Sequence, residues 1–209
     1  MNPHRTMSRF AATALVTVAY VALSAASVGC GGGNNSTASS TTTVVAVFTP
    51  DTATPADGSI TLLPGSTSGA AVNVRVTVTQ MSSFFGAAFR IKYDATALLF
   101  DGMDDSTSFL RAGVTDSSQL FFFADSANSP GEIVITATRL FPAVAVPLVS
   151  TTSDLVILNF VARKSIAPLA AEGRLDFVDP KQACDGTVAA PGCGSITVTA
   201  WKGGGVSAQ

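Results

Sequence analysis

Cys30 is one of three cysteines in this sequence and the one in the most distinctive setting for covalent chemistry. It follows a run of small residues that ends in Gly29, and an apolar segment over residues 10–26 precedes that run. Two arginines, Arg5 and Arg9, lie ahead of the apolar segment. Basic, apolar and small residues in this order are typical of a secretory signal peptide. We therefore predict that the protein is exported.

The same segment resembles a bacterial lipoprotein signal, whose cysteine becomes lipidated. Gly29 fits that pattern, whereas Ser27 stands where an aliphatic residue is usual. The resemblance implies a signal peptide over 1–29, a lipid on Cys30 and an outer-membrane or cell-surface location, because Gly31 is not the aspartate associated with inner-membrane retention. The apolar segment is shorter than the ~20 residues of a membrane span, so we expect no retained transmembrane helix. The alternative is an ordinary signal peptide cleaved nearby, which would leave Cys30 as a thiol.

Cys184 and Cys193 enclose the turn-rich sequence DGTVAAPG. If Cys30 carries lipid, these two form an even pair in an oxidising compartment, where disulfides persist. We therefore predict a disulfide between them. A metal site is the alternative, but no other cysteine or histidine lies nearby in the sequence.

The composition argues against several classes of function. The only histidine, His4, lies in the predicted signal peptide, so the mature chain lacks Ser-His-Asp and Cys-His catalysis and histidine-ligated metals. Without Arg5 and Arg9, ten basic residues remain against fourteen acidic ones, a net charge of −4, and nucleic-acid binding calls for a basic stripe. No glycine-rich phosphate loop is present, so we expect no nucleotide. The only glutamates, Glu132 and Glu172, stand beside glycines at turn-like positions, so we expect no glycosidase pair and no enzyme.

Three aspartates, Asp101, Asp104 and Asp105, lie close together in the sequence DGMDDS. Calcium prefers several carboxylate and carbonyl oxygens in one loop. The run lacks the ordered spacing of an EF-hand, so we predict solvated turn acids and no cofactor, with calcium as the alternative.

The rest of the chain divides into a tether and one all-β domain. Residues 30–43, rich in Gly, Ser and Thr, predict a flexible tether. Farther on, apolar residues recur with a period of two, most clearly over residues 72–79. About nine short strands separated by turn signals, with no amphipathic helix, predict one antiparallel β-sandwich over residues 44–202. The glycine-rich residues 203–209 predict a disordered tail.

Five segments of this domain together resemble a cohesin domain: TLLPGSTSGAAVNVRVTV, FGAAFRIKYDATALLF, GEIVITAT, DLVILNFVARKS and GSITVTAW. The resemblance runs from about Ser59 to Trp201 and implies a jelly-roll β-sandwich. Cohesins bind dockerins, calcium-loaded helical modules of secreted proteins. The resemblance therefore implies a non-catalytic, surface-anchored adaptor that docks a dockerin-like module in polysaccharide breakdown. A carbohydrate-binding module of the same fold and a structural cell-surface protein are the alternatives.

Four charged residues, Arg90, Lys92, Arg174 and Asp176, lie on the polar side of strands that a cohesin would place in its docking sheet. Such residues steer a partner and supply hydrogen bonds at the rim of an interface. The alternative is a solvated face with no partner.

Two aromatic residues are further candidates for contact with a partner. In the run Phe121–Phe123, alternate side chains face opposite sides of a strand, and we predict that Phe122 points away from the core as an apolar anchor. A loop that covers Phe122 is the alternative. Trp201 falls on the side of Thr197 and Thr199, where it could stack on a sugar ring, although packing at the sheet edge is the interpretation we favour.

Overall fold

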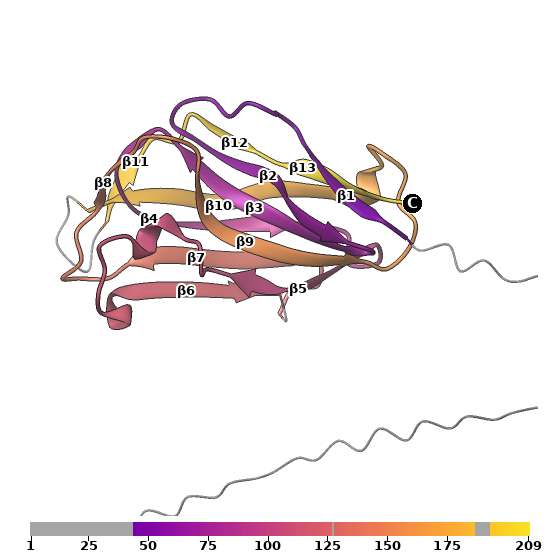
Figure 1. The fold of residues 1–209 in the computed structure, drawn as a ribbon, viewed down its shortest axis with the longest axis horizontal. Coiled ribbons are helices and arrows are strands. Elements are labelled where there is room, and N and C mark those ends of the chain that lie inside the picture. The colour runs from indigo at the N-terminus through magenta and orange to yellow at the C-terminus, as the bar shows by residue number, and fades with distance from the viewer. Residues whose placement is uncertain (1–43, 127, 187–192) are drawn as a thin grey trace, which may run out of the picture. The chain divides into compact units, whose positions relative to one another are not determined.

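The computed structural model describes residues 44–126, 128–186 and 193–209. These residues form two facing β-sheets (Figure 1). The larger sheet has the order β1 (Ala46–Pro50), β13 (Gly204–Ala208), β10 (Arg174–Asp185), β4 (Met81–Lys92), β7 (Glu132–Arg139) and β6 (Leu120–Asp125), with β11 (Gly194–Ile196) paired to β10 and β8 (Val146–Val149) paired to β4. The smaller sheet has the order β12 (Ala200–Lys202), β2 (Ser59–Ser68), β3 (Ala71–Thr79), β9 (Ser153–Ala162) and β5 (Leu98–Asp104).

The predicted all-β sandwich is confirmed. Three single-turn 3-10 segments are the only helical elements among the residues that the structure describes: η1 (Phe109–Arg111), η2 (Ser117–Gln119) and η3 (Ala171–Gly173). None of the helical segments in the described part of the chain is long and apolar enough to cross a bilayer. The ladders are antiparallel except for β12, which runs parallel to β2. The segment GSITVTAW is divided between the two sheets, with β11 in the larger sheet and β12 in the smaller.

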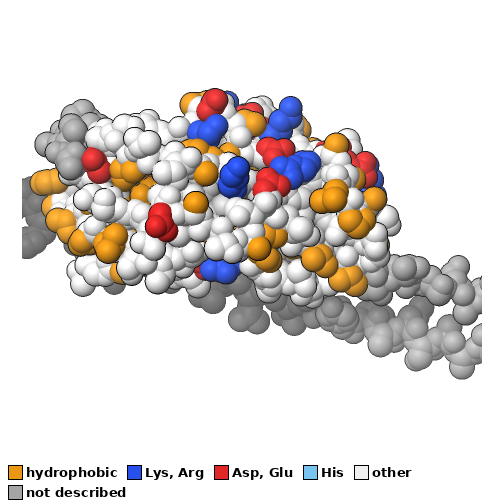
Figure 2. Space-filling model, turned by 90° about the horizontal axis from the view of Figure 1, so that it is seen from above, with side chains coloured by type: hydrophobic (Ala, Val, Ile, Leu, Met, Phe, Trp, Pro, Cys, Tyr) orange, Lys and Arg blue, Asp and Glu red, His pale blue; other side chains and the backbone are white. Residues whose placement is uncertain are grey.

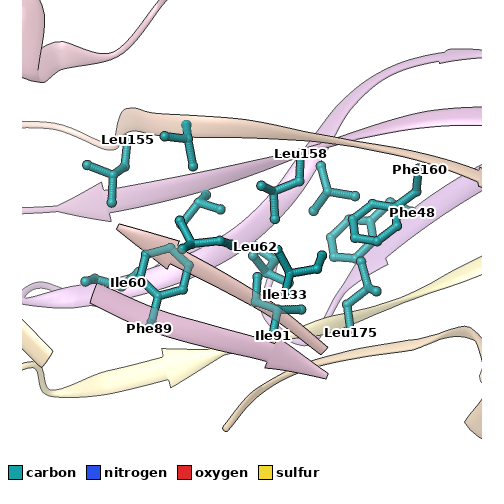
Figure 3. Packing of buried hydrophobic residues seen from close by; sticks show 14 of the residues in the cluster. Phe48, Ile60, Leu62, Phe89, Ile91, Ile133, Leu155, Leu158, Phe160 and Leu175 are labelled. Atoms are coloured by element: carbon teal, nitrogen blue, oxygen red, sulfur yellow. The ribbon is translucent and has the colours of Figure 1, made fainter. Parts of the chain in front are cut away.

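The core lies between the two sheets, where alternate residues of each strand meet (Figure 3). The smaller sheet contributes Ile60, Leu62, Leu158 and Phe160, and the larger sheet contributes Phe89, Ile91, Ile133 and Leu175. The residues that alternate with these point to the outer faces of the two sheets.

The predicted disordered tail is wrong, because residues 204–208 form β13 between β1 and β10. Val206 is only 1% exposed and Ala208 is fully buried. A Cβ atom at Gly204 would overlap with the ring of Phe48, so the glycine allows the ring to pack against the backbone. Glycine repeats are read as flexible from sequence, but here tight packing requires the glycine. The domain therefore extends beyond residue 202.

Residues Thr41–Gln209 form one compact unit, and the strands and core described above all belong to it. The predicted signal peptide over 1–29, the lipidation site Cys30 and the tether over 30–43 lie outside the described residues.

Candidate binding face

The predicted charged residues lie on the neighbouring strands β10 and β4, whose outer face continues over β7 and β6. The register places Asp176 opposite Lys92 and Lys92 opposite Glu132, so one cation stands between two carboxylates. Arg90 lies two residues from Lys92 along β4, and its Nη1 is 2.9 Å from the Glu132 Oε1 atom. Arg90 and Lys92 therefore lie together on one face as expected, and Glu132, which the sequence did not single out, is the residue that joins them. Their role in binding a partner stays a prediction.

Arg174 begins β10 and is held by two carboxylates. Its Nη1 and Nη2 donate to Asp51 Oδ1 and Oδ2 at 2.6 and 2.9 Å, and Nη2 also donates to Asp176. The hydrogen bonds from Arg174 hold the pKa of Asp51 below its ordinary value and outweigh the opposing effect of partial burial. The same contacts, with Asp51 first and Asp176 second, raise the pKa of Arg174. The guanidinium of Arg174 thus donates to carboxylates of its own domain. Lys92 is exposed and is therefore the cation more available to a partner.

A bulge in β10 shapes the middle of this face. Residues 179–181 leave the ladder with β4 between Val178 and Gln182. Beside the bulge lies a depression of about 250 Å³, lined by Ala88 and Val134 from the sheet and by residues of the bulge. The depression gives an otherwise flat sheet face a small apolar recess next to Arg90.

The predicted orientation of the phenylalanine run is wrong. Phe122 is half-buried and packs against the core, with the Arg111 guanidinium 5.2 Å from its ring centroid. Phe121 and Phe123 are instead 45% and 43% exposed, with near-parallel rings whose centroids are 6.3 Å apart. The register explains this, because Phe122 lies opposite the buried Ala137 of β7. Alternation was sufficient to predict that the run divides between two faces, but only the pairing with β7 decides which residues face outward.

Trp201 packs at the sheet edge, as the favoured interpretation predicted. Its ring centroid is 5.1 Å from that of Phe177 and 5.8 Å from that of Phe89, in tilted and edge-to-face geometry. These contacts join β12 of the smaller sheet to β10 and β4 of the larger one. Trp201 is therefore a structural contact between the sheets and is removed from the set of candidate binding residues.

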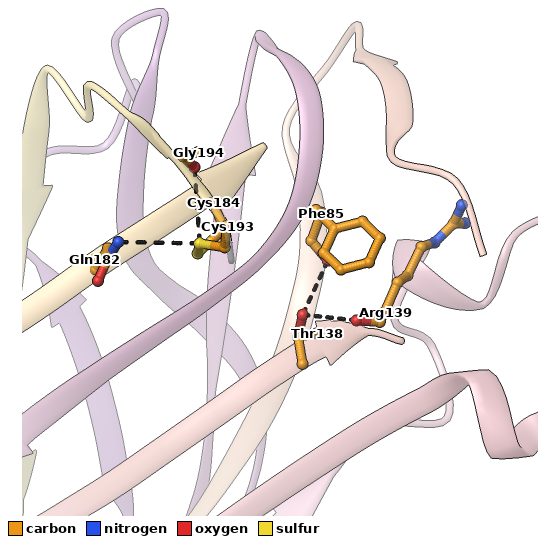
Figure 4. Close-up of a disulfide and its surroundings, with 7 residues drawn as sticks. All are labelled: Phe85, Thr138, Arg139, Gln182, Cys184, Cys193 and Gly194. Atoms are coloured by element: carbon orange, nitrogen blue, oxygen red, sulfur yellow. Dashed lines mark hydrogen bonds between the residues drawn. A yellow bond between two sulfur atoms is a disulfide. The ribbon is translucent and has the colours of Figure 1, made fainter. Parts of the chain in front are cut away.

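The predicted disulfide between Cys184 and Cys193 is confirmed, with a Cα–Cα distance of 5.5 Å. It joins Cys184, the penultimate residue of β10, to Cys193, the residue before β11 (Figure 4). Cys184 lies opposite Gly86 of β4, which in turn lies opposite Thr138 of β7. The disulfide therefore fastens the end of the binding face that also carries Phe121.

Acidic and basic side chains are mixed on the side of the domain that Figure 2 shows. On the side seen in Figure 2, blue and red side chains lie next to one another, with no wide field of one sign. Two of the three aspartates of DGMDDS act in local structure: Asp104 accepts the Ser106 N–H, and Asp105 pairs with Arg111 at 2.7 Å. Asp101 is exposed. In the described part of the chain, no group of three or more His, Cys, Asp or Glu side chains could hold a metal ion.

The family model of the cohesin domain matches residues 59–174, which is more than half of the chain. The chain belongs to the cohesin domain family. The match begins with β2 and ends where β10 begins, so it contains β4, β7 and β6 of the binding face. A search of curated proteins found no match.

Solved cohesin structures are also similar to this cohesin domain. The sixth cohesin of scaffoldin B from Acetivibrio cellulolyticus, solved in complex with a mutant dockerin, is 22% identical, with 69% of this chain and 96% of that chain covered and a TM-score of 0.46. A type II cohesin domain from the cellulosome of the same organism is 14% identical, with 78% and 94% covered and a TM-score of 0.48. A type I cohesin from Pseudobacteroides cellulosolvens is 14% identical, with 64% and 79% covered and a TM-score of 0.42.

Proposed function

We propose that this cohesin domain is a non-catalytic adaptor that docks a dockerin-like module of another secreted protein. The observation that carries the proposal is the outer face of β10, β4, β7 and β6 in a domain of this family. It combines a row of alternating charges, an apolar recess and two exposed phenylalanines. An interface of this composition has apolar anchors for affinity and charges that select and orient the partner.

Lys92 is the residue we expect to contribute most to selection of the partner. It is exposed, whereas Arg90 and Arg174 are half-buried and each is paired with a carboxylate. Because Lys92 lies between Asp176 and Glu132, a partner carboxylate that approaches it must also avoid those two acids. We therefore expect a partner surface that presents acidic and basic groups in a matching order.

The test is a pull-down with residues 41–209 as bait against proteins secreted by the source organism, with and without calcium. We expect calcium-dependent recovery of a protein with paired EF-hand-like loops. Lys92→Glu should abolish that recovery, and Lys202→Glu, an exposed lysine on β12 of the smaller sheet, is the matched control that should leave it intact. Equal recovery with both variants would exclude this face as the docking surface.

Polysaccharide is the second candidate ligand, and the paired rings of Phe121 and Phe123 are the observation that favours it. Two exposed aromatic rings with near-parallel planes on one face could stack on neighbouring sugar units. Retention of the wild-type domain on an insoluble polysaccharide, lost on Phe121→Ala with Phe123→Ala, would support this candidate. Failure of both the pull-down and the polysaccharide assay would favour a structural cell-surface protein.

Lipid anchoring at Cys30 would place the domain at the outer membrane or cell surface, where it could hold its partner near the cell. The proposal rests on the order of basic, apolar and small residues before Cys30. Labelling of the expressed protein with a radioactive fatty acid tests it. Incorporation that is lost on Cys30→Ser, with release of the protein from the membrane fraction, is the expected result, and a labelled Cys30→Ser variant would refute it.

A further inference from the structure

Most of the outer strands of this sandwich are protected against pairing with another chain. Strands β12 and β11 are three residues long and β8 is four. Strand β5 contains a bulge and two aspartates. Strand β1 ends in Pro50, and its first residue, Ala46, donates its N–H to Gly69. Short length, bulges, charges, proline and a covering segment are the devices that keep sheet edges from pairing.

Strand β6 lacks these devices. Its sequence LFFFAD has six residues, no proline and no basic residue, and it pairs with β7 without a register shift. Its one charged residue, Asp125, lies at the end of the strand. In Figure 1, β6 forms the lower border of the larger sheet, and no described strand pairs with its outer edge. An apolar, regular edge of this length is a template for an added strand.

The backbone of β6 offers hydrogen-bonding groups along this edge. Leu140 donates its N–H to Gln119 at 2.7 Å, which makes this position a bonded pair of the β6–β7 ladder. Bonded and non-bonded pairs alternate along an antiparallel ladder. The N–H and C=O groups of Phe122 and Ala124, and the C=O of Leu120, therefore point to the edge, while the Leu120 N–H bonds within the preceding turn.

We propose that β6 pairs antiparallel with β6 of a second copy of this chain, about a twofold axis at Phe122. In this register the two Phe122 backbones bond each other in both directions, and each Ala124 N–H meets the second copy's Leu120 carbonyl. Residues 120–124 of the two strands face one another, and Asp125 lies opposite Gln119, which precedes the strand. A slip of the register by one residue would set bonded groups against groups that already bond β7. A twofold axis at Phe123 would keep the hydrogen bonds but would set Phe121 opposite the second copy's Asp125, so the apolar pairs favour the axis at Phe122.

The side chains of β6 are self-complementary in the same register. Phe121 of one copy lies opposite the second copy's Phe123, so the four exposed rings gather on the outer face. Asp125 lies opposite the second copy's Gln119 rather than a like charge. Cross-strand aromatic pairs stabilise a sheet. A second copy is therefore the occupant that matches this edge in hydrogen bonds, apolar contact and charge.

The contact is small. One pair of strands that overlap over residues 120–124 buries less than the ~800 Å² per partner of a standard interface. The dimer is therefore weak and forms as the protein concentration rises, and attachment of many copies to one surface would favour it.

Sedimentation of residues 41–209 over a concentration series tests the proposal through two charged variants at exposed positions. The average mass of the wild type should rise from that of one chain toward twice that value as the protein concentration increases. The variant F121K/F123K sets lysine against lysine across the twofold axis and should stay monomeric. The variant F121K/F123E sets lysine against glutamate, and the dimer should return at low salt and weaken at high salt. Circular dichroism and thermal unfolding confirm that each variant is folded.

The two variants distinguish pairing of β6 in this register from nonspecific hydrophobic association of the exposed phenylalanines. A wild type that keeps the mass of one chain throughout would overturn the proposal. So would F121K/F123K that dimerises like the wild type, or F121K/F123E that dimerises no better than F121K/F123K. The result is independent of whether the domain docks a dockerin-like module, because no partner is present.

Discussion

The buried guanidinium of Arg139 offers a sharp test of how this domain holds its loops. Arg139 ends β7 and is only 4% exposed, yet it has no carboxylate partner among the ion pairs of the described residues. It donates instead to three main-chain carbonyls: Leu110 at 2.9 Å, Val144 at 2.6 Å, and Ala112. Burial lowers the pKa of Arg139. One side chain therefore fastens the η1 segment and the β7–β8 loop to the end of the larger sheet.

We expect Arg139→Met to lower the free energy of unfolding by about 2–4 kcal/mol. Each hydrogen bond to a charged donor contributes ~1.5–3 kcal/mol, and a buried carbonyl left without a partner costs ~1–3 kcal/mol. The full sum is not expected, because the variant also removes the cost of burying a charge and because the exposed Val144 can bond water. For a urea m-value of ~2 kcal/mol/M, the midpoint should fall by ~1–2 M.

The assay is urea unfolding of residues 41–209, followed by hydrogen exchange of the two loops. Arg75→Met is the matched control, since Arg75 lies on the outer side of β3 and pairs with Asp154 at 2.7 Å. This partly exposed ion pair should contribute less than ~1 kcal/mol. Equal losses in the two variants, or unchanged exchange near Leu110 and Val144 in Arg139→Met, would refute the reasoning that the buried donor organises the loops.

Three further predictions concern stability and use the same domain. Trp201 is the only tryptophan, so its emission should shift to the red on unfolding, and Trp201→Ala should cost about 2 kcal/mol in urea unfolding because its ring contacts are lost. Hydrogen bonds from Arg174 lower the pKa of Asp51 in the folded state. The contribution of Asp51 to the free energy of unfolding is therefore present above its unfolded pKa and is lost as the pH falls through its folded pKa. Asp51→Asn should therefore be less stable than the wild type at neutral pH, by no more than ~1 kcal/mol, and the two should converge in acid; a constant difference across pH would contradict this. Reduction of the disulfide, or Cys184→Ser with Cys193→Ser, should lower the unfolding free energy by about 2–3 kcal/mol, as expected for a short closed loop, and calorimetry with and without reductant measures it.

The sequence correctly predicted features that depend on neighbours along the chain. The period-two pattern of residues 72–79 predicted β3, and the pairing of Cys184 with Cys193 followed from their number and from the turn between them. The placement of Arg90 and Lys92 on one face also followed from alternation along β4.

The wrong predictions concern features that depend on contacts between distant segments. The orientation of Phe122 is decided by its pairing with Ala137, and residues 204–208 form a strand because β1 and β10 lie on either side of them. Local composition predicts neither contact. A glycine-rich terminus can be either a flexible tail or a closely packed strand, and its composition does not distinguish the two.

The sequence by itself determined the class of the fold, because alternation of apolar and polar residues allows a strand only one buried side. Only the tertiary structure decided which outward residues share a surface. The register between β10, β4 and β7 brings Asp176, Lys92 and Glu132 into one row, although they lie far apart along the chain. A slip of one residue in any ladder would turn that strand's side chains to the opposite face. The candidate binding face is thus a product of strand pairing, and the packing of the two sheets around one core selects that pairing.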